Sequence, residues 1–360
     1  MWEHVNCSRF IWNWGLDFQK KRYEEFGDKL SGYDLVKQLT PLKKQEEYQW
    51  LKSVSNKMLT TTLLDLDKAY NNFFKSGFGF PKFKSKKKSR KSFPIRNTLY
   101  FTESEVFIEK LKKIPYQTNY QIPLGKDVKF YNPRIHYTPN SKWILTVSIK
   151  CENQASELTD IPMGIDLGVK ELATVVFGED KLTFKNINKT REMKKLEKKL
   201  RRVQRQISRK YEMNKQDNKF VKTQNIIRLE DEVRKLQYHM SNIRQNYIHQ
   251  TTHKLINLKP CRITVEDLNI SGMMKNKHLS KAIQQQNFYE FIRQLEYKCS
   301  WNGIELMKAD RFYPSSKTCS NCGCIKSDLK LSDRTYICPD CGIVIDRDYN
   351  AAINLMKYAN

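Results

Sequence analysis

The stretch Cys338-Pro339-Asp340-Cys341-Gly342 decides the fold of the C-terminal region, together with Cys319-Ser320-Asn321-Cys322-Gly323, fifteen residues before it. Four thiolates in two Cys-x-x-Cys pairs fit the tetrahedral coordination of Zn²⁺, and the glycine after each pair lets the loop wrap around the sulfurs. A redox dithiol would need only one such pair. Four protein ligands close the coordination sphere, so the pattern predicts one structural Zn²⁺ held by Cys319, Cys322, Cys338 and Cys341. Cys324 is left out because its two-residue offset does not recur in the second pair.

Three acidic residues are candidates for catalysis, two of them before the cysteine pairs in the sequence and one after them. Two of them end apolar runs, in Gly164-Ile165-Asp166 and in Ile263-Thr264-Val265-Glu266. The third belongs to a predicted helix start, Asp346-Arg347-Asp348-Tyr349. Mg²⁺ prefers hard oxygen ligands, and two such ions about 4 Å apart can activate a water and stabilise the leaving oxygen of a phosphodiester. The sequence therefore predicts a nuclease of the RNase H type with two catalytic Mg²⁺ ions, if the fold brings Asp166, Glu266 and Asp348 together.

Each of these acids also has a structural interpretation. Asp166 could cap a turn, and Asp348 could cap the last helix. Glu266 is harder to explain in this way, because a carboxylate at the end of a buried run is costly without a cation. Strand alternation puts Asp267 on the face opposite Glu266. Asp346 lies two residues before Asp348, and the sequence alone does not separate the two.

Composition indicates the kind of partner. The 360 residues contain 65 Lys and Arg against 39 Asp and Glu, a net charge of +26. Such charge repels itself and favours a polyanion, and nucleic acid is the usual one because Lys and Arg release counterions from phosphates. No apolar run approaches the ~20 residues of a membrane span, and the first residues lack a signal-peptide pattern. Nine cysteines, an odd number without a regular framework, favour a reducing compartment over disulfides.

The N-terminal half divides into two predicted parts. Residues 1–76 show aromatic and leucine spacing typical of a helical lobe, with one short helix ending near Pro41. Residues 77–158 begin with a Gly- and Pro-rich break and alternate in a β manner, with strands expected at 106–108, 114–116, 128–130, 134–137 and 143–149. Between break and strands lies a basic loop, 82–91, which is either a solvated linker or a grip on a nucleic-acid backbone. Its basic residues are Lys82, Lys84, Lys86, Lys87, Lys88, Arg90 and Lys91.

The C-terminal half is expected to be a nuclease domain over 159–310, a zinc ribbon over 311–345 and a final nuclease segment over 346–360. Apolar strands at 161–167 and 172–177 form a hairpin, and further strands lie at 261–266 and 304–309. Helices are predicted at 288–299 and 349–358. Residues 189–258 show the three-and-four spacing of an antiparallel helix pair. The first arm carries a basic face suited to phosphate: Lys194, Lys195, Lys198, Lys199, Arg201, Arg202 and Arg205.

These motifs together resemble TnpB, the transposon-encoded family related to type V CRISPR effectors. The resemblance rests on Gly164–Gly168, Val265–Met273, Arg311–Cys319 and Asp346–Asn354, and less specifically on Phe10–Trp14 and Gly79–Lys86. It covers nearly the whole chain. Members usually begin with an extra strand before the first helix, whereas this sequence starts almost at that helix. We expect either a wedge-like barrel with one strand fewer or a start that was trimmed or replaced.

The resemblance implies an α+β multidomain protein: a helical recognition lobe, a wedge-like β domain, and a RuvC-like nuclease domain with a helical-hairpin insertion and an inserted zinc ribbon. It implies an RNA-guided DNA endonuclease whose guide RNA comes from the transposon end and whose target is double-stranded DNA beside a short flanking motif. Asp166, Glu266 and Asp348 match the catalytic acids, and the four cysteines match the zinc ligands. We expect a monomeric ribonucleoprotein in a prokaryotic cytoplasm, associated with the nucleoid.

Two other functions are compatible with parts of this pattern. A guided DNA-binding repressor would keep the fold without cutting, although relatives of that kind lose the acids that are present here. A DNA transposase of the RNase H type would use similar carboxylates for strand transfer and would need no RNA. A cleavage assay with guide RNA and Mg²⁺ separates the nuclease from the repressor. A transposase should insert DNA without bound RNA, so co-purifying nucleic acid that ribonuclease destroys favours the guided protein.

Overall fold

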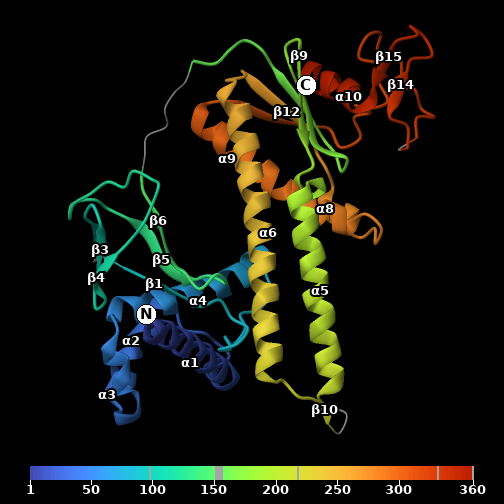
Figure 1. Ribbon diagram of the computed structural model, residues 1–360. Helices are drawn as coiled ribbons and strands as arrows, with labels where there is room; N and C mark the ends of the chain where they lie inside the picture. The colour runs from blue at the N-terminus through green and yellow to red at the C-terminus, as the bar shows by residue number, and fades with distance from the viewer. Residues whose placement is uncertain (97–98, 151–156, 217–218, 331, 359–360) are drawn as a thin grey trace. The chain divides into compact units, whose positions relative to one another are not determined.

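The computed structural model describes residues 1–96, 99–150, 157–216, 219–330 and 332–358 (Figure 1). The chain mixes helices and sheets and forms two compact units, Met1–Cys151 and Glu152–Asn360. Among the described helices, none combines the length and the apolar composition that a lipid bilayer would require.

The first unit begins with helices. They are α1 (Trp2–Phe26), α2 (Gly32–Lys37), α3 (Leu39–Lys44), the 3-10 helix η1 (Glu46–Ser53) and α4 (Asn56–Ser76). The prediction of one short helix ending near Pro41 is wrong, because α3 runs through that residue. Pro41 lies in the first turn of α3, where a backbone N–H has no partner within the helix and its loss costs little.

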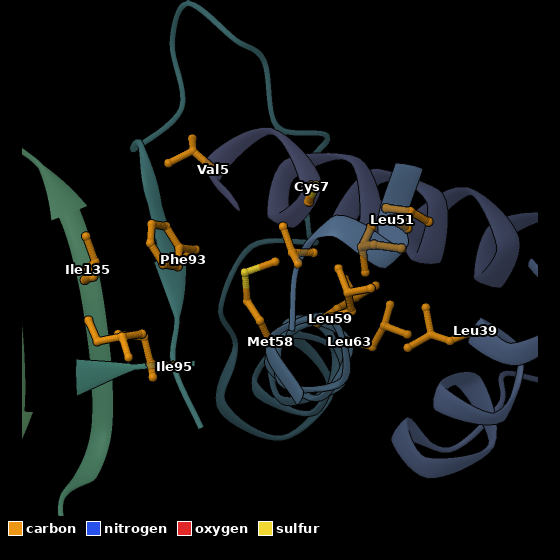
Figure 2. Close-up of a cluster of buried hydrophobic side chains, with 14 of the residues drawn as sticks. Val5, Cys7, Leu39, Leu51, Met58, Leu59, Leu63, Phe93, Ile95 and Ile135 are labelled. Carbon is orange, nitrogen blue, oxygen red and sulfur yellow. The ribbon is translucent and has the colours of Figure 1, made fainter. Parts of the chain in front are cut away.

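An apolar core joins these helices to the first strands (Figure 2). Figure 2 shows Cys7 of α1 and Met58, Leu59 and Leu63 of α4 on one side, with Phe93 beyond them. All five side chains are buried. The apolar residues that recur along α1 and α4 therefore form a packed interior, and most of the aromatic residues that recur along these helices pack against it.

Two small sheets complete the first unit. One has the order β1 (Ser92–Pro94), β5 (Tyr131–Tyr137), β6 (Trp143–Ser148), and the other has the order β2 (Leu99–Phe101), β3 (Glu105–Ile108), β4 (Lys112–Pro115). The strand predicted at 128–130 does not form. The turn residues Pro123, Gly125 and Asp127 precede it, and Phe130 instead contributes its ring to Phe101, 5.0 Å away between centroids. β1 and β2 are too short for the sequence pattern to have predicted them.

The described part of the second unit is built on a five-stranded sheet with the order β13-β12-β7-β8-β9. β7 (Met163–Leu167), β8 (Glu171–Phe177) and β9 (Asp180–Lys185) form an antiparallel meander. β12 (Arg262–Glu266) lies parallel to β7, and β13 (Glu305–Ala309) lies parallel to β12. Since the carboxyl ends of parallel strands meet at one edge, Asp166 and Glu266 are brought to the same edge of the sheet.

Helices cover this sheet. The short η2 (Ile187–Lys189) leads into α5 (Arg191–Met213), which packs along α6 (Gln224–Asn257), and the two-residue strands β10 (Lys215–Gln216) and β11 (Lys219–Phe220) pair at the tip. After β12 come α7 (Ile270–Met273), α8 (Ser280–Gln286) and α9 (Phe288–Asn302). Apolar side chains of α6 and α9 form one core with β7 and β12. The predicted helix pair and the predicted 288–299 helix are therefore present.

The last segment returns to the sheet. β14 (Thr335–Ile337) pairs with β15 (Val344–Asp346), and β15 leads directly into α10 (Arg347–Lys357), seen beside the sheet in Figure 1. α10 begins two residues earlier than the sequence predicts. The acids of this segment therefore fall at the cap and in the first turn, where carboxylates suit a helix N-terminus.

Candidate acidic, cysteine and basic sites

Gly164 allows α10 to reach the sheet. A Cβ at this position would lie 2.1 Å from the backbone oxygen of Ala352 and 2.3 Å from the backbone nitrogen of Met356. Real Cβ contacts do not come this close, so the helix backbone rests directly on the strand backbone. Asp166 lies two residues further along β7 and therefore on the same face, toward α10.

The strand register then aligns two of the acids. Thr264 pairs with Gly164 and Val265 with Ile165 in the parallel ladder. One residue further along both strands come Glu266 and Asp166, on strands about 4.8 Å apart. Asp348 lies one helical turn before Ala352, about 6 Å back along α10, and two strand residues span a similar distance. The contact at Gly164 thus carries Asp348 toward the position of Asp166.

The electrostatics agree with this convergence. Burial raises the pKa of Asp166 well above its usual value, and the charges of Glu266 and Asp348 raise it further, whereas Arg347 lowers it. Burial also raises the pKa of Glu266, although the Ser315 hydroxyl and Arg347 oppose this and Asp348 adds to it. Because the charges of Glu266 and Asp348 act on the buried Asp166, the three carboxylates lie near one another.

Arg347 forms an ion pair within this group. Its Nη2 lies 2.9 Å from Oδ1 of Asp348, and the two side chains are only 14% and 18% exposed. Arg334 is a second, longer partner of Asp348 at 3.8 Å. In the described chain the oxygens of the three carboxylates do not all lie within 4.8 Å of one another. Arg347 binds Asp348, and Ser315 binds Glu266. A site for two metal ions does not require all its ligand oxygens to lie so close together, because the ions stand about 4 Å apart.

The structure gives the two rival acids separate roles. Oδ1 of Asp346 accepts a hydrogen bond from the backbone N–H of Tyr349 at 2.9 Å, so Asp346 is the N-cap of α10. Asp267 forms an ion pair with Arg311 at 2.6 Å. Asp348 has no cap role, and its charge raises the pKa of Asp166 more than the charge of Asp346 does.

Sequence reasoning missed three polar residues beside this group. The hydroxyl of Ser315 donates a hydrogen bond to Oε1 of Glu266. Asn350 and Asn354 are buried on α10 and bond to the backbone of residues 315–320. Their i, i+4 spacing among alanines was the available signal, because two amides on an apolar helix face need buried partners.

The four predicted cysteines do come together. Each offers a sulfur, and the four sulfurs lie within 4.8 Å of one another. The sulfurs of Cys319 and Cys341 are 3.6 Å apart, and those of Cys322 and Cys338 are 3.5 Å apart. Tetrahedral Zn²⁺ with Zn–S bonds of about 2.3 Å requires sulfurs about 3.8 Å apart, so the donor set fits that ion. Cys324 is outside the group, and its backbone oxygen accepts from the N–H of Cys319 at 2.8 Å.

The basic loop 82–91 is anchored on α1 and exposed beyond its anchor. Asn13 donates to the backbone oxygen of Lys84 at 2.9 Å and accepts from its N–H at 2.7 Å. Nζ of Lys84 lies 3.6 Å from the centre of the Trp12 ring. Burial lowers the pKa of Lys84 to about 8, with a contribution from Arg134. The remaining basic side chains are exposed except for the half-buried Lys91: Lys82, Lys86, Lys87, Lys88 and Arg90.

The basic face of α5 is partly neutralised by the protein itself. Lys199 pairs with Glu232 of α6 at 3.0 Å, and Arg201 pairs with Glu197 at 3.0 Å. The other predicted residues of this face, among them Arg202 and Arg205, are exposed. Arg311 and Lys317 near the acids are also engaged, since Lys317 donates to the backbone oxygen of Ser327 at 2.7 Å.

Comparison with known proteins agrees with the resemblance of the motifs. A family model described as "Probable transposase" matches residues 146–277, one described as "Cas12f1-like, TNB domain" matches 288–355, and a "Helix-turn-helix domain" matches 1–28. A relative from Streptomyces pristinaespiralis named RNA-guided DNA endonuclease is 29% identical over 353 residues, 97% of this chain and 83% of the relative. The chain belongs to the TnpB family.

Two further comparisons extend this family assignment. The RNA-guided DNA endonuclease InsQ of Escherichia coli (strain K12) is 29% identical to this TnpB family member over 371 residues, 98% of this chain and 86% of the relative. Among solved structures, a Cas12f1-sgRNA-target DNA complex matches with a TM-score of 0.62 at 14% identity, over 98% of this chain and 81% of that chain. At this identity the structural match shows a shared fold.

Proposed function

We propose that this TnpB family member is an RNA-guided DNA endonuclease. On this proposal, a guide RNA from the transposon end directs the protein to double-stranded DNA beside a short flanking motif. The relatives named RNA-guided DNA endonuclease support the activity, and the Cas12f1 complex, which contains guide RNA and target DNA, supports the partners. The protein acts as a monomeric ribonucleoprotein.

The convergence of Asp166, Glu266 and Asp348 carries this proposal. The sheet order, with a three-stranded meander followed by two parallel strands on the other side of β7, supports the proposal of an RNase H-like (RuvC) domain. Two bound Mg²⁺ ions would supply an activated water and stabilise the leaving oxygen. The chain's own acids would hold these ions, with Asp166 and Glu266 presented from adjacent strands and Asp348 from the first turn of α10.

Two other groups of residues support the reaction. The four cysteines would hold one structural Zn²⁺, which closes the segment before α10 and leaves no ligand position for substrate. The exposed lysines of loop 82–91 would contact phosphates of the nucleic acid without reading its sequence. A small pocket between this loop and α1 adds Arg9 to the same surface.

The test is cleavage by the purified ribonucleoprotein. RNA that co-purifies with the chain is sequenced to obtain the guide, and matching duplex DNA is incubated with the complex and Mg²⁺. Asp166→Asn keeps the shape of the side chain and removes its charge, so we expect at least a 100-fold loss of cleavage with guide-dependent DNA binding retained.

Asp180→Asn is the matched control, because Asp180 is an exposed residue at the start of β9. It should cut like the wild type. A wild type that binds the guided target without cutting it would instead identify a repressor, and DNA insertion without RNA would identify a transposase. Either result would overturn the proposal.

A further inference from the structure

Glu266 is held in place by a residue outside the sheet. The Ser315 hydroxyl donates to Oε1 of Glu266, and Ser315 is only 3% exposed. Glu266 lies at the end of β12, while Ser315 belongs to the segment that leads to the first cysteine pair. A hydrogen bond from a buried hydroxyl to a carboxylate fixes the rotation of that carboxylate and therefore the direction in which its free oxygen points.

The position of Ser315 is in turn fixed by α10. Nδ2 of Asn354 donates to the backbone oxygens of Ser315 and Thr318, both at 2.7 Å. Nδ2 of Asn350 donates to Thr318 at 2.7 Å, and its Oδ1 accepts from the N–H of Ser320 at 2.9 Å. These two buried amides form what we term the asparagine clamp, Asn350 with Asn354.

The clamped segment also carries a cysteine of the four-sulfur site. Cys319 stands between Thr318 and Ser320, two of the three residues whose backbone groups the clamp binds. Segment 315–320 is therefore fastened at one end to the sulfurs, along its length to α10, and through Ser315 to Glu266. A shift of the cysteine loop would move the Ser315 hydroxyl relative to the carboxylate.

We propose that Ser315 is a positioning residue for Glu266, and that the asparagine clamp makes this positioning depend on the four-cysteine site. The inference rests on the proposed function in that Glu266 is taken to hold a divalent cation. Groups that orient a ligand of a metal ion typically contribute 10- to 100-fold to metal affinity or activity. Deleting the hydroxyl should therefore weaken cation binding while leaving the fold and DNA binding intact.

The experiment measures cation binding directly, with Mn²⁺ as the probe and electron paramagnetic resonance as the readout, on the full chain without guide RNA. Asp166→Asn gives the background level. Ser315→Ala should bind Mn²⁺ at least 10-fold more weakly than the wild type. Ser316→Ala is the matched control and should bind Mn²⁺ like the wild type. The Ser316 hydroxyl is next to Ser315 in the chain and forms no hydrogen bond in the described structure.

The dependence on the cysteine site is tested by a cycle. Zinc is removed with a zinc-selective chelator, and Mn²⁺ affinity is measured for the wild type and for Ser315→Ala with and without zinc. If zinc acts through Ser315, its removal weakens the wild type about as much as Ser315→Ala does, and the two losses do not add. Asn354→Ala should give the same loss with zinc still bound, whereas Asn302→Ala, whose amide bonds within α9, should not.

Several outcomes would overturn the inference. Mn²⁺ affinity unchanged in Ser315→Ala would show that the hydroxyl only satisfies a buried polar group. Fully additive losses would separate zinc from Ser315, and a wild type at the Asp166→Asn background would leave no cation site to position. None of these readouts uses cleavage. A chain whose Mn²⁺ affinity depends on Ser315 but which cuts no DNA would therefore refute the proposed function and leave this inference standing.

Discussion

Burial raises the pKa of Asp166, and the neighbouring Glu266 and Asp348 raise it further. In the chain without Mg²⁺, the folded state therefore binds this proton more tightly than the unfolded state does. Between the ordinary carboxyl pKa of about 3.9 and the raised value, the folded state carries the extra proton. The free energy of unfolding must fall as the pH rises through that window.

Asp166→Asn should remove this dependence. We expect the variant to unfold at a higher temperature than the wild type at neutral pH without Mg²⁺, and to show a flatter dependence on pH between 4 and 8. Each kcal/mol corresponds to about 2–4 °C for a unit of this size. Thermal unfolding in Mg²⁺-free buffer with zinc retained measures both, with Asp180→Asn as control. Equal slopes in the two variants would contradict the electrostatic account of the site.

The sequence could indicate the acids and the cysteines because each carries its own signal, an acid that ends an apolar run or a sulfur at fixed spacing. It could not separate Asp346 from Asp348, since the distinction is one hydrogen bond to the N–H of Tyr349. It could not predict Ser315 at Glu266 either. Those residues are 49 positions apart, and their contact depends on the return of the chain to β12.

At the scale of elements, the site depends on how closely α10 approaches β7. Gly164→Ala would place a Cβ against the backbone of Ala352 and Met356, which has no flexible end that could move aside. We expect a loss of about 1–3 kcal/mol of unfolding free energy from the overpacking. Because Asp348 moves with the helix, the variant should also bind Mn²⁺ more weakly.

Urea unfolding and Mn²⁺ titration measure these two effects of Gly164→Ala. Gly79→Ala is the control for the substitution, since a Cβ at Gly79 meets no atom within 4 Å. Full retention of both stability and Mn²⁺ affinity in Gly164→Ala would show that α10 does not need this contact.

The elements were predictable to different degrees. Long periodic segments such as α5 and α6 were clear from the sequence because several apolar residues repeat along each. The sequence did not predict β9. It is an edge strand whose side chains alternate between exposed and half-buried, and it contains few apolar residues. Strands β1 and β2 have three residues each, too few for a periodic pattern, and β1 forms by pairing with the distant β5 while β2 pairs with the neighbouring β3.

At the scale of the whole molecule, the net charge of +26 favours a polyanionic partner. Nucleic-acid binding should therefore weaken steeply with salt, because each neutralised phosphate releases a counterion. Changing Lys86, Lys87 and Lys88 to Gln should lower the slope of log affinity against log salt by about 2–3 if all three contact phosphates.

Filter binding from 50 to 300 mM salt measures that slope. The same charge change at Lys110, in the turn between β3 and β4, and at Lys112 and Lys113 of β4 separates the role of the loop from that of net charge. Equal slopes for the two triple variants would remove loop 82–91 from the nucleic-acid surface. The composition predicted the class of partner, but the solvent exposure of individual basic residues needed the structure.

The junction between β15 and α10 has an evolutionary consequence. Asp346 is both the last residue of the strand and the cap of the helix, so the chain has no slack there. A helix turns by about 100° per residue, and a single inserted or deleted codon between the second cysteine pair and Asp348 would swing that carboxylate away from β7. Homologues should vary in amino acid along this junction far more readily than in its length.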